Sequence, residues 1–148
     1  MSQTYYNIWI HLVWSTKDRQ PLLKKAFRQQ IFQHIRKKAE AEGIWLDTIN
    51  GMEDHVHSLI SLHPKYAVSD VVNKLKGESS HWINSEDFLK VKFAWQRGFS
   101  AFSVSESGVD KVRKYIKNQE EHHRKQAFRE EVEKLYKLHK IQWEEGRT

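Results

Sequence analysis

The sequence contains no cysteine and no long run of apolar residues. Without cysteine the chain can form neither disulfide bonds nor a thiolate metal site, so any bound metal must be held by histidine, carboxylate, amide or water. The missing apolar run excludes a membrane-spanning helix, and residues 1–6 lack the basic and apolar stretches of a secretory signal. We therefore expect a protein of the reducing cytoplasm with no membrane partner.

The chain is instead rich in aromatic and charged residues. Of its 148 residues, 39% are hydrophobic and 30% are charged, and six are tryptophan, a composition that excludes a disordered chain. A chain of this length can bury roughly 70% of its unfolded surface, which is enough for one core. We expect a single domain over residues 1–148.

The formal net charge is +6, which favours a polyanionic partner, because lysine and arginine that neutralise phosphates release condensed counterions. A basic surface can also serve solubility alone. Charge by itself therefore leaves nucleic acid as one of two interpretations.

Alternating hydrophobicity predicts strands at residues 6–14, 44–50 and 55–62, and one or two edge strands within 91–104. The first of these has apolar residues on both faces, which is typical of a central strand. Asn50-Gly51 predicts the turn of a hairpin between the second and third strands.

Apolar residues at helical spacing predict helices at residues 24–42, from Ser69 to about residue 83, near 108–125 and near 127–140. Ser69 would cap the second helix, and Ser107-Gly-Val-Asp110 has the spacing of a capping box that would open the third. The order of elements predicts an α+β fold, a ferredoxin-like or RRM-like sandwich in which helices pack on a largely antiparallel sheet.

Two histidines, His55 and His57, lie two positions apart in a predicted strand. The period of two directs both imidazoles to the same face, where they could chelate one ion. With nine histidines in 148 residues, about half a pair at this spacing is expected by chance, so the motif alone leaves a structural role open.

A phenol and an amide, Tyr115 and Gln119, lie four residues apart on one side of the predicted helix near 108–125. The amide could supply a third metal ligand, and the lysines and arginines around it could hold a phosphate beside the phenol. The alternative is structural: Tyr115 packs at the edge of the core and Gln119 faces solvent.

Taken together and in this order, the motifs resemble the HUH single-tyrosine transposases of small bacterial insertion sequences and their repeat-associated relatives. The resemblance covers most of the chain and rests on Trp14-Ser-Thr-Lys-Asp-Arg19, Asp54-His-Val-His57, Leu75-Lys-Gly-Glu-Ser-Ser80 followed by Trp82, Trp95-Gln-Arg-Gly98, and Tyr115-Ile-Lys-Asn-Gln-Glu-Glu-His-His123.

The resemblance implies that His55, His57 and Gln119 bind Mg²⁺ or Mn²⁺ and that Tyr115 is the nucleophile. The ligand types by themselves also accept a later transition metal. A phenol with a pKa of about 10 attacks poorly while protonated, so a metal beside the phosphate would help by polarising it. Attack would give a 5′-phosphotyrosine, which a free 3′ hydroxyl could reverse to join a new strand.

The resemblance further implies a homodimer that binds single-stranded DNA with hairpin-forming ends. The residues that we expect to contact DNA are Lys76, Ser79, Ser80, Arg97, Lys114 and Lys117. Trp95 and Phe99 could stack on bases or close the core.

Three further histidines have simpler interpretations. We expect His11 to be a hydrogen-bonded histidine of the sheet, and His122 and His123 to lie on a solvated helix face.

Two other functions stay open at this point. One is a domesticated relative with the same chemistry that processes genomic palindromic repeats. The other is a non-catalytic nucleic-acid-binding α+β module, in which the histidines are structural and the aromatic residues stack on bases.

Overall fold

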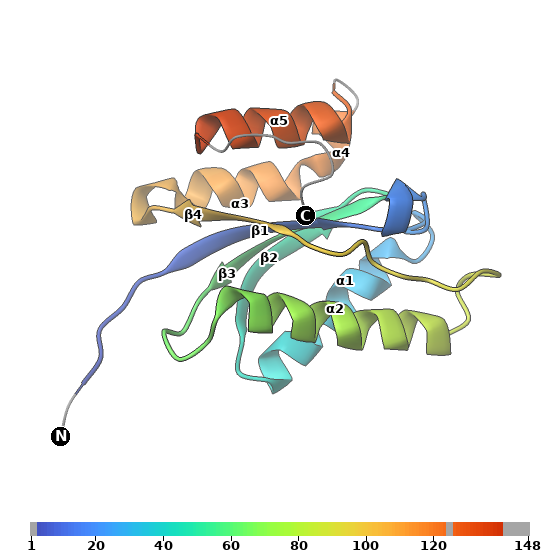
Figure 1. Ribbon diagram of the computed structural model, residues 1–148, viewed down its shortest axis with the longest axis horizontal. Coiled ribbons are helices and arrows are strands. Elements are labelled where there is room, and N and C mark those ends of the chain that lie inside the picture. The colour runs from blue at the N-terminus through green and yellow to red at the C-terminus, as the bar shows by residue number, and fades with distance from the viewer. Residues whose placement is uncertain (1–2, 124–125, 141–148) are drawn as a thin grey trace.

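A computed structural model describes residues 3–123 and 126–140 as a four-stranded antiparallel sheet with helices on both faces (Figure 1). The strands are β1 (Trp9–Ser15), β2 (Trp45–Gly51), β3 (His55–Ser61) and β4 (Ser100–Val104), in the order β2-β3-β1-β4. β1 pairs with β3 on one side and with β4 on the other. The predicted α+β fold and the central first strand are thus confirmed.

The helices form two layers. The helices α1 (Arg28–Ala41) and α2 (Val68–Ser85) cover one face of the sheet, while α3 (Val109–Lys117), α4 (Gln119–His123) and α5 (Phe128–Leu138) lie on the other (Figure 1). Short 3-10 turns occupy Lys17–Arg19 and Glu106–Gly108. None of the helices in the described part of the chain is long and apolar enough to cross a membrane.

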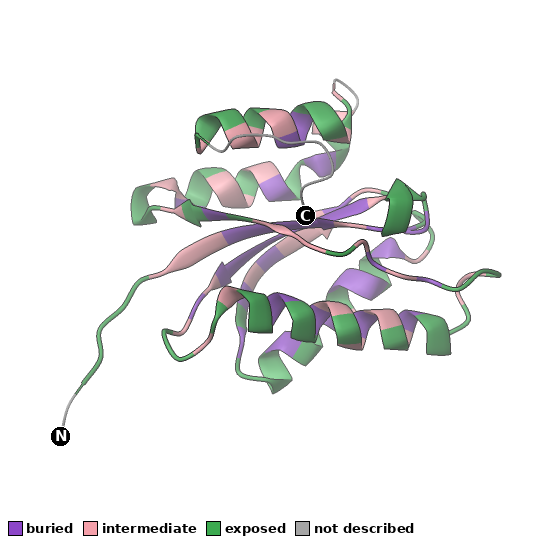
Figure 2. Ribbon diagram, viewed as in Figure 1, coloured by how far each residue is buried: buried purple, intermediate pink, exposed green. Residues whose placement is uncertain are grey.

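The two faces of the sheet differ in chemistry. Alternate residues such as Leu12, Val56 and Ile60 belong to the large apolar core, which also contains the buried residues of α1 and α2. The opposite face has only a small apolar cluster of buried residues, formed by Leu59 with Val109 and Ile116 of α3. Several strand positions on this face are nevertheless buried (Figure 2), among them His11, His55 and His57, so this layer encloses polar side chains.

The hairpin turn lies later than the sequence predicts. β2 continues through Gly51, and the turn is made by residues 52–54, closed by a hydrogen bond from the Met52 N–H to the His55 carbonyl oxygen at 3.0 Å. A Cβ atom on Gly51 would lie 2.1 Å from that same oxygen. Glycine is therefore needed here for close approach of the two strands, and Asn50-Gly51 is not the turn.

The predicted helix caps are also wrong. α2 begins after Ala67, so Ser69 lies inside the helix, and Ser107 lies in the 3-10 turn that precedes Val109. The predicted helix near 108–125 is interrupted at Asn118, whose backbone leaves helical values (φ −99°, ψ 30°). Asparagine favours such helix ends because its side chain competes for backbone hydrogen bonds. The end of that predicted helix, residues 124–125, lies outside the described residues.

Candidate active site

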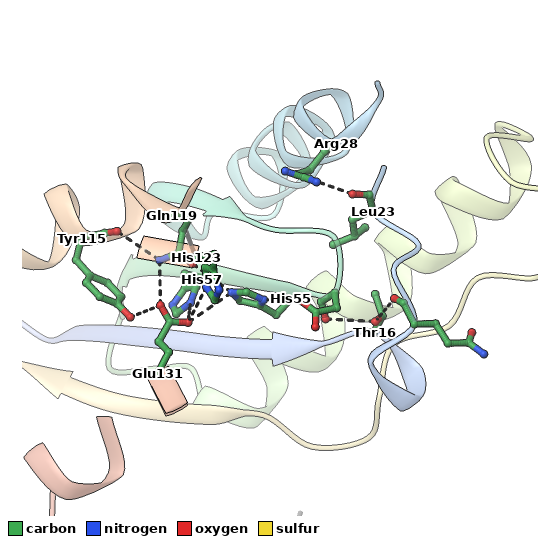
Figure 3. A network of polar contacts seen from close by, with 11 residues as sticks. Thr16, Leu23, Arg28, His55, His57, Tyr115, Gln119, His123 and Glu131 are labelled. Atoms are coloured by element: carbon green, nitrogen blue, oxygen red, sulfur yellow. Dashed lines mark hydrogen bonds and ion pairs between the residues drawn. The ribbon is translucent and has the colours of Figure 1, made fainter. Parts of the chain in front are cut away.

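His55 and His57 lie side by side on β3 and are both fully buried. They project from the face of the sheet that α3, α4 and α5 cover, and their Nε2 atoms point toward the same carboxylate (Figure 3). The strand period thus places both imidazoles on one face, as the sequence predicts.

The other ring nitrogen of each histidine is held by a neighbour. Nδ1 of His55 lies 2.8 Å from Oδ1 of Asp54, and Nδ1 of His57 lies 2.9 Å from Nε2 of His11. His11 is therefore the hydrogen-bonded sheet histidine that we expect. Such outer partners orient a metal-ligating imidazole and leave its second nitrogen free for an ion.

The protonation of these rings follows from their burial. Burial lowers the pKa of His57 to about 4 and that of His11 to about 3. Burial would also lower the pKa of His55, but the carboxylates of Asp54 and Glu131 outweigh it and raise that pKa above its usual value. His57 and His11 are thus neutral at physiological pH, the form in which imidazole binds metals.

Glu131 of α5 reaches into the centre of this layer, and its side chain is 1% exposed. Its Oε1 atom lies 3.0 Å from Nε2 of His57, 3.3 Å from Nε2 of His123 and 3.5 Å from Nε2 of His55. Burial would raise the pKa of Glu131, but the surrounding imidazoles outweigh it and hold the pKa well below its usual range. Glu131 is therefore a buried carboxylate anion.

The second carboxylate oxygen contacts the predicted nucleophile. Oε2 of Glu131 accepts a hydrogen bond from the Tyr115 hydroxyl, and it lies 3.4 Å from Nε2 of Gln119. Burial, together with the negative charge of Glu131, raises the pKa of Tyr115. The tyrosine hydroxyl is thus protonated and donates its hydrogen to Glu131.

Gln119, the first residue of α4, is also fully buried. Its Oε1 atom lies 3.1 Å from Nε2 of His55. The structural alternative, in which Gln119 faces solvent, is therefore wrong. The sequence-predicted residues His55, His57, Tyr115 and Gln119 all meet in one place.

The donor atoms of this cluster fit a metal ion. The ligand atoms of His55, His57 and Glu131 all lie within 4.8 Å of one another. Around an ion with bonds of about 2.1 Å, neighbouring ligand atoms are about 3.0 Å apart in an octahedron and about 3.4 Å apart in a tetrahedron. The observed separations of 3.0 and 3.5 Å between the histidine nitrogens and Glu131 match these values.

Sequence reasoning missed Glu131, although a signal for it exists. The helical spacing of Phe128, Glu131 and Leu135 places the carboxylate on the same stripe as two apolar residues. A charged residue on such a stripe is buried when the helix packs, and it then needs a partner.

Two residues that we expect to contact DNA, Lys76 and Ser79, make hydrogen bonds within the protein. The ammonium group of Lys76 donates to the carbonyl oxygens of Gln96 and Gly98, at 2.7 and 2.9 Å. Ser79 is fully buried, and its hydroxyl accepts a hydrogen bond from Nε1 of Trp95. The prediction that Ser79 contacts phosphate is wrong because its side chain is fully buried, whereas DNA contact by the half-buried Lys76 stays a prediction.

The other predicted contacts differ in exposure. Arg97, Lys114 and Lys117 are exposed and Ser80 is half-buried, so for these four DNA contact stays a prediction. Trp95 closes the core: its side chain is 9% exposed and packs edge-on against Trp14.

The two neighbouring histidines of α4 do not both lie on a solvated face. His122 is half-buried with its ring 4.5 Å from that of Tyr115. The side chain of His123 is only 10% exposed. The expectation of a solvated face is therefore wrong for His123, which turns into the site.

Comparison with known families gives a match over residues 4–119 to the family described as IS200-like transposases. The ISDra2 transposase TnpA of Deinococcus radiodurans is 31% identical over 119 residues, which cover 77% of this chain and 85% of that protein. The transposase for insertion sequence element IS200 of Salmonella typhimurium is 29% identical over 125 residues, covering 80% of this chain and 81% of that protein. The family match ends at Gln119, so His123 and Glu131 lie beyond it.

Two solved structures have a similar fold. A crystal structure of a protein of Deinococcus radiodurans R1, described as a transposase, superposes with a TM-score of 0.65 and 28% identity, covering 80% of this chain and 98% of that chain. A REP-associated tyrosine transposase bound to a REP hairpin superposes with a TM-score of 0.55 and 18% identity, covering 80% of this chain and 70% of that chain. At 18% identity the second likeness shows the fold alone.

Proposed function

Since the chain belongs to the family of IS200-like transposases, and thus to enzymes that cut and rejoin DNA, we propose that it acts on single-stranded DNA through a covalent bond to Tyr115, with the help of a divalent metal ion. The observation that carries the proposal is the convergence of four side chains from three elements. Tyr115 of α3, Gln119 of α4 and the two histidines of β3 meet around one buried carboxylate.

His55, His57 and Gln119 would hold the ion, which we propose to be Mg²⁺ or Mn²⁺. Once bound, the ion would polarise a phosphate beside it and offset the developing negative charge. Asp54 and His11 would keep the two imidazoles oriented, because they hold the Nδ1 atoms.

In the proposed reaction the phenolic oxygen of Tyr115 attacks phosphorus. The bond between phosphorus and the 3′ oxygen breaks, the 3′ oxygen leaves with a proton as a hydroxyl, and the 5′ phosphate stays on the tyrosine. Attack on this linkage by a 3′ hydroxyl of another strand reverses the step, returns the proton to the phenol and joins the strands. No nucleotide cofactor is required, because one phosphodiester bond replaces another.

The carboxylate of Glu131 lies against the Tyr115 hydroxyl, at the place that the attacked phosphate has to approach. Two anions repel each other when they share a buried site. The proposal therefore requires that Glu131 leaves the Tyr115 hydroxyl before the scissile phosphate binds beside it.

The DNA partner that we propose is a single strand with hairpin-forming ends. The likeness in fold to a transposase bound to a REP hairpin is consistent with it.

The homodimer stays a prediction, and sedimentation of the purified protein would measure the oligomeric state. Tyr115 and His57 already meet within one chain, with ring centroids 5.7 Å apart.

The deciding experiment compares two tyrosine variants. Each is incubated with Mn²⁺ and a labelled single-stranded end, and label that stays on the protein in denaturing electrophoresis is measured. We expect the adduct in the wild type and in Tyr136→Phe, whose hydroxyl lies 2.9 Å from Oγ of Ser100. We expect none in Tyr115→Phe, which keeps the ring and loses the attacking oxygen. An adduct that persists in Tyr115→Phe would exclude this tyrosine as the nucleophile.

A further inference from the structure

His123 is a further potential metal ligand of the site. It belongs neither to the strand motif nor to the range of the family match. Its Nε2 atom is buried and has no hydrogen-bond partner among the described residues. The same atom lies 3.3 Å from Oε1 of Glu131, and the ring centroid lies 4.7 Å from that of His55. A buried ring nitrogen of this kind needs a partner, because burial removes the hydrogen bonds it makes to water.

Three imidazole nitrogens surround a single carboxylate oxygen. The Nε2 atoms of His57, His123 and His55 lie 3.0, 3.3 and 3.5 Å from Oε1 of Glu131. One carboxylate oxygen has about two lone pairs, so it cannot accept good hydrogen bonds from all three rings. Hydrogen bonds account for His57, and for His55 through Oε1 of Gln119 at 3.1 Å, but they leave Nε2 of His123 unexplained.

A cation explains the arrangement better. Ligand atoms that share an ion are about 3.0 to 3.4 Å apart when the bonds are about 2.1 Å long, which is the range seen around Glu131. The amide oxygen of Gln119, 3.1 Å from Nε2 of His55, also falls in this range. The ligand atoms of His55, His57 and Glu131 lie within 4.8 Å of one another, and Gln119 and His123 adjoin this group through one contact each, at 3.1 Å to His55 and 3.3 Å to Glu131.

We propose that His123 and Glu131 bind the same divalent ion as His55 and His57 when no DNA is present. The inference rests on the metal site of the proposed function and adds two ligands to it. It gives the ion three imidazoles, one carboxylate and one amide. Such a nitrogen-rich set favours Mn²⁺ or a later transition metal over Mg²⁺, which prefers oxygen ligands and water. It also makes the ion a link between α5 and the sheet.

The test is a titration of the metal-free protein with Mn²⁺ in the absence of DNA, with the free ion followed by its electron paramagnetic resonance signal. The variants are His123→Gln and Glu131→Gln, which keep side chains of similar length and replace an imidazole or a charged carboxylate by a neutral amide, a weaker ligand. Their controls are the neighbours His122→Gln and Glu130→Gln. Circular dichroism of each metal-free variant verifies the fold, and Glu131→Ala serves as a second variant if Glu131→Gln does not fold.

We expect each ligand variant to bind Mn²⁺ at least about tenfold more weakly, since even outer-shell changes cost a metal site that much. The controls should stay within about twofold of the wild type. A loss smaller than about threefold in either variant would remove that residue from the ligand set. Amide exchange in α5 should slow on adding Mn²⁺ to the wild type but not to Glu131→Gln, an effect that a merely structural role of Glu131 would not produce.

The outcome is separate from the adduct assay. Unchanged Mn²⁺ affinity in both variants, with the Tyr115 adduct still formed, would overturn this inference and leave the proposed function standing. A wild type that binds neither Mn²⁺ nor Mg²⁺ would overturn the inference and the metal part of the proposed function together.

Discussion

The ring of Phe128 lies parallel to the imidazole of His55, with ring centroids 3.9 Å apart and planes 11° from each other. The guanidinium carbon of Arg19 lies 4.8 Å from the centroid of the same phenyl ring. Arg19 adopts a positive φ of 54° in the turn after β1, a conformation that residues other than glycine seldom take. Stacking on His55 thus fastens the first turn of α5 to the histidine pair of β3, one turn away from Glu131.

Replacing Phe128 by alanine should loosen α5. The stack contributes about 1.4 kcal/mol to the docking of the helix, so amide exchange in α5 should become roughly tenfold faster. Leu138→Ala is the matched control, because Leu138 lies on the same helix and is 75% exposed. Mass spectrometry of hydrogen exchange measures both variants. Equal protection of α5 in Phe128→Ala and the wild type would mean that the stack does not hold the helix.

Binding of single-stranded DNA should itself expose α5. His55, His57 and Gln119 are fully buried, and Glu131 is 1% exposed, so a phosphate can reach the Tyr115 hydroxyl only if α5 moves. We expect faster amide exchange in α5 when DNA is added to the Tyr115→Phe variant, which cannot form an adduct. Exchange in α2, on the opposite face of the sheet, should not change. Slower exchange in α5 with DNA present would contradict the expected movement.

Removing two exposed charges of α3 should weaken DNA binding. The double change Lys114→Gln and Lys117→Gln should lower affinity for a single strand, and the slope of log affinity against log salt should fall by about 0.7 for each lost phosphate contact. Lys37→Gln with Lys38→Gln, on α1, removes the same charge from the other face and should change the slope less. Fluorescence anisotropy between about 50 and 200 mM salt measures the DNA affinity of each variant. Equal slopes for the two double variants would mean that DNA does not contact Lys114 and Lys117.

The ion pair that anchors α3 to β2 should make stability depend on pH. Arg113 donates from Nε to Oδ1 of Asp47 at 2.8 Å and from its terminal nitrogen to Oδ2 at 3.0 Å. The hydrogen bonds from Arg113 lower the pKa of Asp47 below its ordinary value of 3.8. Because the folded pKa is the lower one, the pair contributes its full stability above the ordinary pKa of 3.8, and this contribution is lost as the pH falls from there through the folded pKa.

Asp47→Asn should therefore be less stable than the wild type at pH 7, and the difference should shrink below about pH 4. Asp110→Asn is the control, since Asp110 contacts the same arginine but is 84% exposed; it should cost little. Urea unfolding at pH 7 and pH 3 measures both. If the free energy of unfolding differs between Asp47→Asn and the wild type by the same amount at both pH values, the carboxylate charge does not stabilise the fold.

Much of the site could be predicted because local periodicity decides it. A strand turns His55 and His57 to one face, and a helical spacing of four residues brings Tyr115 and Gln119 to one side, whatever the rest of the fold does. Glu131 depends instead on how α5 docks on the sheet, whereas His123 on α4 continues the four-residue spacing of Tyr115 and Gln119. The contact between His57 and Glu131 joins residues 74 positions apart, and no periodicity of either segment contains it.

The hairpin turn lies later in the chain than the Asn-Gly signal predicts. Asn-Gly is a strong turn signal because both residues tolerate unusual backbone angles. In this protein Gly51 is instead the last residue of β2 and is needed for the close approach of the His55 carbonyl oxygen across the hairpin, a role that the Asn-Gly signal does not distinguish from a turn.

The pairing of the last strand with the first has a consequence for how the protein is made. β1, β2 and β3 can pair once residue 61 has left the ribosome, but β1 and β4, where Trp9 faces Val104, cannot pair until residues 62–104 have also been synthesised. Pairing between such distant segments is slow, because the chain between them must be ordered first. A growing chain therefore carries its two histidines on β3 well before Tyr115 and α5 are synthesised. Chains released early would hold the histidine pair without the tyrosine beside it.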